Sequence, residues 1–472
     1  MASHGHDLQA DGSNDLLQLG PKASTLSLVL LVVGVLGVLA SLGVAVSTGE
    51  GLKRFYHAYL TAYAYFFSIA MGGLFFLLIH YLVRAGWSTS IRRIPEALAA
   101  TLPVMGLLTI PLLVSVFSGK GLLYNWAQPI PAHPEHTAPH LIEQLTHAKA
   151  DHSAGGAVTA HSDSHADAAH TPAAGAKPVS ALTKGKVVWL NPSFWTARVV
   201  FYLVFFSLVA AYFVRKSRQQ DETGDHTITQ RLSIVAAPLM LFVFVAFSFA
   251  AFDLLMSLDS DWYSTVFGVY YFAGSVDAMV AAVIVIAAIL QRAGYLQHSV
   301  NKEHYHDLGK YLFAFTFFWG YIAFSQYMLY WYANIPDTTY WLAKRGATTN
   351  PDQLKVLHGW AVVSILLLFG RLLIPFAGLL SRHVKRNRPA LVFWAIWILV
   401  FHFLDMVWIV MPEYSATASH QPGRLTLGLP ELAAMIGVGG IFAGAVVWRL
   451  SSAPLRPVRD PRLGEALVFQ NI

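Results

Sequence analysis

The sequence of 472 residues contains no cysteine. This absence excludes disulfides, thiolate-ligated iron–sulfur clusters and covalently attached c-type haem from the chain. Charged residues are also scarce, at 12%, whereas 55% of the residues are apolar. Because such a chain has too little polar surface to cover a water-soluble core, we predict a membrane protein with several spans.

Long apolar runs recur about ten times, each with about the 20 residues that cross a bilayer as a helix. The runs are continuous rather than short and alternating, which favours a helical bundle over a β-barrel. We therefore predict an all-α polytopic membrane protein with about ten transmembrane helices. The predicted spans are 25–47, 56–82, 98–117, 195–214, 234–257, 264–290, 309–335, 354–381, 389–411 and 430–449.

The orientation follows from the distribution of Lys and Arg between the loops. The loops on the N-terminal side carry more of these residues than the loops on the other side, so both termini are predicted to be cytoplasmic. Residues 1–20 lack a basic segment followed by an apolar one, so we expect no cleaved signal peptide. The predicted parts are a cytoplasmic N-terminal segment (1–24), helices 1–3 (25–127), a His-rich periplasmic insert (128–190), helices 4–10 (191–449) and a cytoplasmic tail (450–472).

The insert is rich in Ala, Gly, Pro, Ser and Asp as well as histidine. Its histidines have irregular spacing, and the composition is typical of a flexible, solvated segment. A metal site is the alternative interpretation. The eight histidines are His133, His136, His140, His147, His152, His161, His165 and His170.

Ionisable residues inside the spans are candidate functional groups, because a charge near the bilayer centre costs about 3 kcal/mol or more. They are Asp253, Asp277, Arg371, His402 and Asp405. His402 and Asp405 are three residues apart and share a helix face, so the pair could hold or relay a proton. A neutral, hydrogen-bonded pair that joins helices is the alternative.

Three further histidines, His57, His80 and His358, lie near the ends of spans. Two stacked b-type haems usually need histidine pairs about four turns apart on facing helices. His57 and His80 are 23 residues apart and close to opposite faces, so we do not expect a dihaem cytochrome b.

The seventh span carries an unusual number of polar side chains. Tyr321, Ser325, Met328 and Tyr332 step by four, three and four residues and form one stripe, which we expect to face protein or a cavity. With the deep Gln326, the stripe suits a water-supported proton path or the head of a quinone. Plain hydrogen bonding between helices would need the same groups.

Three stretches together resemble a known family: FDLLMSLDSDWYSTVFGVYYFAGS (252–275), EHYHDLGKYLFAFTFFWGYIAFSQYMLYWYANIPDTTYW (303–341) and FHFLDMVWIVMP (401–412). They are similar to the ActF-type, NrfD-like membrane subunits of bacterial alternative complex III, a quinol oxidoreductase unrelated to cytochrome bc1. The resemblance covers roughly residues 190–412, and the His-rich insert departs from it. It implies two four-helix bundles, spans two to five and six to nine, with the first and last spans outside.

The resemblance also implies the chain's surroundings. The expected partners are an ActC-like paralogue, an iron–sulfur subunit and c-type cytochromes in a bacterial inner membrane, with a terminal oxidase as a further candidate. The c-type haems and iron–sulfur clusters would lie on those partners, with no cofactor in this chain and quinol as a candidate ligand nearby. We expect contact with membrane lipid and none with nucleic acid.

The leading functional hypothesis is a transmembrane proton path in such a complex; whether the chain takes part in catalysis itself stays open. A secondary transporter and a purely structural membrane scaffold are the alternatives. The family-like stretches contain Asp253, the segment from His304 to Asp307, His402 and Asp405. His80 and Asp277 lie outside these stretches and are candidates because they are ionisable residues within or near a span. The predicted path residues are His80, Asp253, Asp277, His304, His306, Asp307, Tyr321, Ser325, Gln326, Tyr332, His358, His402 and Asp405.

Overall fold

The computed structural model describes residues 15–49, 51–128, 185–346, 359–418, 425 and 427–470. Among these residues, ten helices are long and apolar enough to cross a membrane, so the prediction of an all-α, multi-pass membrane protein is confirmed. The spans are Lys22–Ser47, Gly51–Leu82, Arg93–Phe117, Pro192–Thr223, Thr227–Leu258, Phe267–Arg292, Lys302–Ala333, Gly359–Leu380, Arg388–Ser415 and Leu429–Ser451.

Several spans consist of more than one helical segment. The first half of the chain contains α1 (Lys22–Ser47), α2 (Gly51–Leu82), η2 (Trp87–Ser90), α3 (Arg93–Ala99), α4 (Leu102–Leu108), α5 (Ile110–Phe117), η3 (Asn125–Ala127), α8 (Pro192–Thr223), α9 (Thr227–Leu254) and η5 (Met256–Leu258). The second half contains α10 (Phe267–Arg292), α11 (Lys302–Ala333), α12 (Pro336–Lys344), α13 (Gly359–Leu366), the π-helical η7 (Leu367–Leu373), α14 (Ile374–Leu380), α15 (Arg382–Arg386), α16 (Arg388–Ala418), α17 (Leu429–Ser451) and α18 (Leu463–Leu467).

Prolines account for the breaks in the third and eighth spans. Pro103 and Pro111 stand in the first turns of α4 and α5, where the missing N–H costs no helical hydrogen bond. Pro375 stands in the first turn of α14, directly after the π-helical turn. Its ring would collide with the carbonyl four residues earlier, that of Arg371, and the wider turn avoids this collision.

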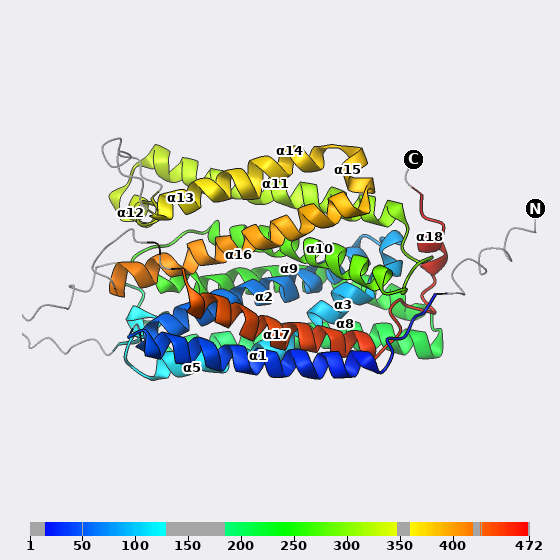
Figure 1. The fold of residues 1–472 in the computed structure, drawn as a ribbon, viewed down its shortest axis with the longest axis horizontal. Helices are drawn as coiled ribbons and strands as arrows, with labels where there is room; N and C mark the ends of the chain where they lie inside the picture. The colour runs from blue at the N-terminus through cyan, green and yellow to red at the C-terminus, as the bar shows by residue number, and fades with distance from the viewer. Residues whose placement is uncertain are drawn as a thin grey trace, which may run out of the picture.

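The spans form two adjoining four-helix groups (Figure 1). In the first bundle, α2 packs against α3 and α9, and α8 packs against α4 and α9. In the second bundle, α10 packs against α11 and α16, while η7 and α14 contact α11 and α16. The bundles meet where α2 contacts α10 and α16, and α2 is the most buried of the spans.

The first and last spans, α1 and α17, lie side by side outside these bundles and contact α2 (Figure 1). Small residues allow this close approach. A Cβ added at Gly37 would lie 2.7 Å from the Cα and the nitrogen of Gly437, so the two backbones touch. Ser27 and Ser41 of α1 donate hydrogen bonds to the carbonyls of Gly444 and Pro430, both at 2.8 Å.

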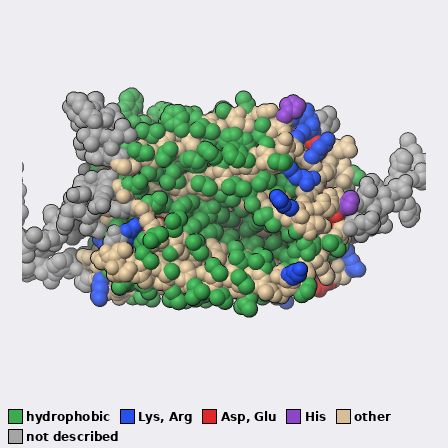
Figure 2. Space-filling model, viewed as in Figure 1, with side chains coloured by type: hydrophobic (Ala, Val, Ile, Leu, Met, Phe, Trp, Pro, Cys, Tyr) green, Lys and Arg blue, Asp and Glu red, His purple; other side chains and the backbone are tan. Residues whose placement is uncertain are grey.

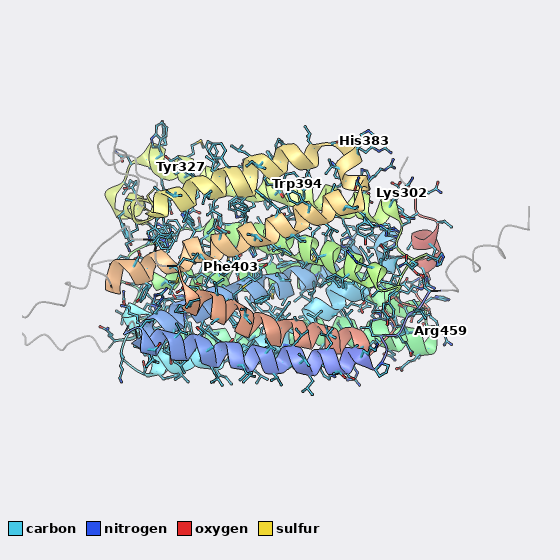
Figure 3. All side chains as sticks on the ribbon, viewed as in Figure 1. Lys302, Tyr327, His383, Trp394, Phe403 and Arg459 are labelled. Atoms are coloured by element: carbon cyan, nitrogen blue, oxygen red, sulfur yellow. The ribbon has the colours of Figure 1, made fainter. Side chains whose placement is uncertain are left out.

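Both described terminal segments lie at one end of the bundle, which we call the terminal end; the opposite end is the far end (Figure 1). Leu455 donates a backbone hydrogen bond to Leu17, which joins the two segments. In the view of Figure 2, hydrophobic side chains cover the middle of the molecule, and Lys and Arg gather at its ends. Figure 3 shows α11 running between these ends, with Lys302 near the terminal end and Tyr327 toward the far end. Most of the predicted insert, including its eight histidines, lies outside the described residues.

The α1–α17 contact generates a test with a matched control in the same helix. Gly37→Ala should lower the unfolding free energy of the detergent-purified chain by about 1 to 3 kcal/mol, because the new methyl group overpacks the contact. Gly43→Ala should cause no loss, because nothing lies within 4 Å of a Cβ there. Thermal unfolding of both variants measures the difference, and equal melting temperatures would contradict the close packing.

Candidate functional site

The central feature of the second bundle is Arg371, a guanidinium with no exposed surface near the middle of the eighth span. It belongs to the π-helical turn before Pro375. Its guanidinium lies over the ring of Trp319 on α11, with the Cζ atom 4.2 Å from the ring centroid. A Cβ on Gly274 of α10 would lie 2.8 Å from its Nη2 atom, so a larger residue there would have to displace the guanidinium from its present partners.

Two side chains of α16 hold the charged end of Arg371. Its Nη1 donates to Asp405 in a buried ion pair, and its Nη2 donates to Nδ1 of His402 at 2.9 Å. The hydroxyl of Tyr270, on α10, donates to the other carboxylate oxygen of Asp405. We call these four residues the Arg371 centre: Arg371, Asp405, His402 and Tyr270.

The hydrogen bonds determine which nitrogen of His402 carries its proton. Arg371 can only donate, so Nδ1 accepts and the neutral ring must carry its proton on Nε2. Nε2 then donates to the Ser68 hydroxyl oxygen at 2.8 Å, and Ser68 donates to the carbonyl of Tyr65 at 2.6 Å. His402 and Asp405 share a face, as predicted, but both bind Arg371 instead of each other.

Asp277 lies on the same face of α10, one turn from Gly274 toward the terminal end. It is completely buried, and the hydroxyl of Thr316 donates to its Oδ1 at 3.2 Å. Its Oδ2 has no hydrogen-bond partner among the described residues. Because burying an unpaired carboxylate is costly, Asp277 is the acid best suited to bind and release a proton.

The far end holds a second set of buried charges, the far-end cluster, made of Asp259, Tyr340, Lys344, Arg345 and Glu413. Lys344 bridges Asp259 and Glu413 at 2.7 and 3.1 Å, and Arg345 lies 3.3 Å from Glu413. Tyr340 donates to Asp259 at 2.6 Å. Glu413 lies eight residues beyond Asp405 on α16, about 12 Å along the helix.

The pKa values in this cluster follow from its ion pairs. Burial pushes the pKa of Asp259 up, but the charge of Lys344 and hydrogen bonds from Lys344 and Tyr340 outweigh burial and leave the pKa below its ordinary value. Because the pKa is lowered, the ionised carboxyl stabilises the fold at neutral pH. That contribution is lost as the pH falls through the lowered pKa.

The terminal end holds two buried histidines on either side of Trp87. The ring centroids of His80 and His304 lie 5.5 and 6.4 Å from that of Trp87. His80 donates from Nδ1 to the Phe76 carbonyl at 2.8 Å, and its Nε2 has no partner in the described part of the chain. Asn301 offers His304 Nδ1 both an N–H at 3.2 Å and a side-chain oxygen at 2.9 Å, so either His304 tautomer fits.

His306 and Asp307 lie beside this pair at the start of α11. The Nδ1 of His306 is 3.8 Å from an Asp307 oxygen, which also pairs with Lys310 at 2.5 Å. The residues predicted for the terminal end therefore lie together there.

Asp253 lies in the first bundle, apart from these groups, and its carboxylate is saturated with donors. Arg198 binds it with two hydrogen bonds, at 2.8 and 2.9 Å, and Trp189 and Tyr202 donate at 3.0 and 3.2 Å. A carboxylate held by four such bonds is stabilised in one state. Its geometry suits a fixed link between α8 and α9 better than proton exchange.

The predicted polar stripe on α11 points outward. Tyr321, Met328 and Tyr332 are 57%, 44% and 85% exposed, so the stripe is not covered by this chain's own helices, and its expected contact with protein stays a prediction about neighbouring subunits. The spacing identified which residues share a face of α11 but not the direction of that face. Gln326 is buried and lies on the opposite face of the helix. His358 lies outside the described residues.

Several residues that bind the predicted path residues were not themselves predicted as part of the path. Arg198 was detectable as a charge inside the predicted span 195–214. Arg371 is among the predicted intramembrane charges, but no partner was predicted for it. Glu413 follows directly after the predicted span 389–411. Tyr270 and Ser68 carry no such signal, because tyrosine and serine are common in spans.

The fold and its buried ionisable groups define a polytopic helical membrane protein with a charged centre. Within the described ranges, no group of three or more His, Asp or Glu side chains is arranged to hold a metal ion. No protein-family model and no curated protein matches the chain.

The two acids can be distinguished by stability. Asp253→Asn should lower the unfolding free energy by about 3 to 5 kcal/mol, because it leaves Arg198 buried without a carboxylate. Asp277→Asn should change it by no more than about 1 kcal/mol, because it breaks no ion pair and asparagine can still accept from Thr316. Thermal and denaturant unfolding of the purified variants measures both, and equal losses would contradict the distinction.

Proposed function

We propose that this chain is an ActF-type, NrfD-like membrane subunit of bacterial alternative complex III, and that its second bundle carries protons between the two membrane faces. The observation that carries the proton path is Asp277, a buried acid with one unpartnered oxygen among the described residues, beside a fixed positive charge. Arg371, although paired with Asp405, still attracts a carboxylate at Asp277, which partly offsets the cost of releasing the proton there.

The ionisable groups occur in order from one end to the other along the second bundle and the face of α2 that packs against it. His80 and His304 are at the terminal end, Asp277 and the Arg371 centre follow, and Glu413 begins the far-end cluster. Thr316 is twelve residues beyond His304 on α11, about 18 Å along the helix axis. Side chains and intervening water would bridge these intervals, as in other proton relays through membranes.

The first bundle has a different role in this proposal. Its buried Arg198–Asp253 pair joins α8 to α9, so this bundle anchors the fold. The outward stripe of α11 presents Tyr321 and Tyr332 to neighbours in the membrane. The redox centres, c-type haems and iron–sulfur clusters, would belong to partner subunits, with quinol bound near the membrane subunits. The terminal end would face the cytoplasm of a bacterial cell.

A secondary transporter would need room for a substrate near the middle of the membrane. The Arg371 centre is filled by its own side chains, since Arg371, His402 and Asp405 are at most 1% exposed and Gly274 admits no added Cβ. In the eighth span, α13, η7 and α14 follow one another with no non-helical residue between them, so the span has no unwound stretch at its middle. This packing favours the passage of protons over that of a larger substrate.

The proposal predicts a specific defect for Asp277→Asn in the native complex. Quinol-driven electron transfer in uncoupled membranes should stay within about twofold of the wild-type rate, because the redox centres are elsewhere. The proton-to-electron ratio in sealed vesicles should fall, because asparagine has no proton to release. Asp405→Asn is a poorer test, because it also leaves Arg371 without its carboxylate.

The control is Tyr321→Phe, which removes a hydroxyl from the exposed stripe and should leave the ratio unchanged. Each complex is first purified through a tag on this chain, and c-type haem should appear in its absorbance spectrum. A normal ratio in the assembled Asp277→Asn complex would reject the path. Purification of the chain without haem-containing companions would reject the assignment to this complex.

A further inference from the structure

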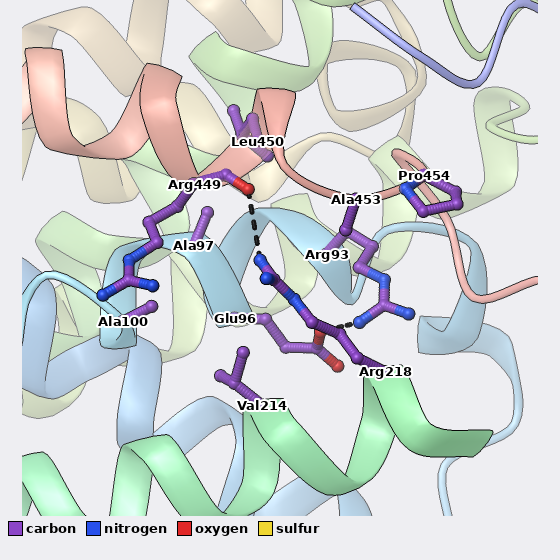
Figure 4. Close-up of a pocket in the computed structure, with 10 residues that line it drawn as sticks. All are labelled: Arg93, Glu96, Ala97, Ala100, Val214, Arg218, Arg449, Leu450, Ala453 and Pro454. Atoms are coloured by element: carbon purple, nitrogen blue, oxygen red, sulfur yellow. Dashed lines mark hydrogen bonds and ion pairs between the residues drawn. The ribbon is translucent and has the colours of Figure 1, made fainter. Parts of the chain in front are cut away.

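An arginine-lined pocket at the terminal end takes no part in the proton path. It lies between α3, α8 and α17, and its empty space is about 250 Å³, part of which is open solvent. Arg93, Glu96, Arg218 and Arg449 supply its charged lining. Figure 4 shows the guanidinium of Arg218 in the middle, with Glu96 and Arg93 to one side and Arg449 to the other.

The carboxylates around this pocket are already engaged by two other arginines. Arg93 pairs with Glu96 and Asp221, and Arg92 pairs with Asp460 and, at 3.4 Å, with Glu96. These three carboxylates exceed the two arginines by one negative charge, so adding Arg218 and Arg449 leaves the pocket and its surroundings with a net charge of about +1.

Of the three arginines that line the pocket, Arg93 pairs with carboxylates, whereas Arg218 and Arg449 form no ion pair with a carboxylate among the described residues. Arg218 donates from Nη2 to the Ser452 hydroxyl at 2.9 Å and to the Arg449 carbonyl at 3.4 Å, and its buried Nε has no partner there. The Arg449 guanidinium lies over the ring of Trp448, 4.5 Å from its centroid. Two like charges lining one pocket are unfavourable unless an anion lies between them.

The position of the pocket indicates the class of anion. Arg218 is five residues from the end of α8, and Arg449 is two residues from the end of α17, so both lie where a span leaves the apolar layer. Trp448 and Tyr212 are 52% and 38% exposed nearby on the same helices, as is typical of aromatic side chains at the headgroup level. Val214 and Leu450 form an apolar part of the lining.

We infer that this pocket binds a phosphate group through Arg218 and Arg449, which a phospholipid headgroup of the adjoining leaflet would supply. Guanidinium forks match phosphate oxygens with paired N–H donors. The single negative charge of a phosphodiester would balance the net positive charge that remains at the pocket, and its acyl chains would extend along the apolar surface of α8 and α17. Free phosphate shares this chemistry but lacks the acyl chains.

The test uses the full-length chain, purified, delipidated and observed by native mass spectrometry. The probes are phosphatidylglycerol, phosphatidylcholine and inorganic phosphate, each titrated separately. We expect one tightly retained phosphatidylglycerol per chain, weakened about tenfold or more by Arg218→Gln and by Arg449→Gln. The control is Arg215→Gln, an exposed arginine on the same helix that is not among the residues lining the pocket, which should leave retention unchanged.

Each outcome bears on the inference. Retention of inorganic phosphate that depends on both arginines, without retention of phosphatidylglycerol, would support the phosphate site and assign it to a soluble ligand. Equal retention of phosphatidylglycerol by the two pocket variants and by Arg215→Gln would overturn the inference. Arg449→Gln keeps the test valid if Arg218→Gln fails to fold, because no hydrogen bond of the Arg449 side chain is found within the described residues.

Discussion

The buried charge of Arg371 is the constraint on which the second bundle depends. A guanidinium with no exposed surface must be paired, because an unpaired charge in this setting would cost several kcal/mol. Its neighbours meet that need: α16 supplies Asp405 and His402, α11 supplies the face of Trp319, and α10 supplies Gly274, where any larger residue would collide. Through His402 and Ser68 the same network reaches α2 and joins the two bundles.

The two bundles use buried acids in opposite ways. In the first bundle, Asp253 is held by Arg198 and by two aromatic donors, so its geometry suits a fixed link between α8 and α9. In the second bundle, Arg371 is paired with Asp405, which leaves Asp277 nearby with one oxygen lacking a donor in the described structure. This difference distinguishes a bundle whose buried acid is fully paired from a bundle that contains a buried acid with an unpaired oxygen, and it is the basis of the proposed division of roles.

Hydropathy was sufficient to locate all ten spans, because bilayer thickness sets their length. Helical periodicity also placed His402 and Asp405 on one face. It could not show that Arg371 lies between them, because pairing across helices depends on how distant segments pack. The same limit applies to Tyr321 and Tyr332: a period of 3.6 shows that they share a face, but not that this face points away from the other helices of the chain.

The central claim is that Asp277, and not Asp253, exchanges a proton inside the membrane. Infrared difference spectroscopy of the purified protein after a pH step measures this directly, because a carboxyl group that gains or loses a proton changes its C=O absorption. The account predicts a carboxyl band that responds to the pH step, is present in wild type and disappears in Asp277→Asn. The same band persisting in folded Asp277→Asn would contradict the account.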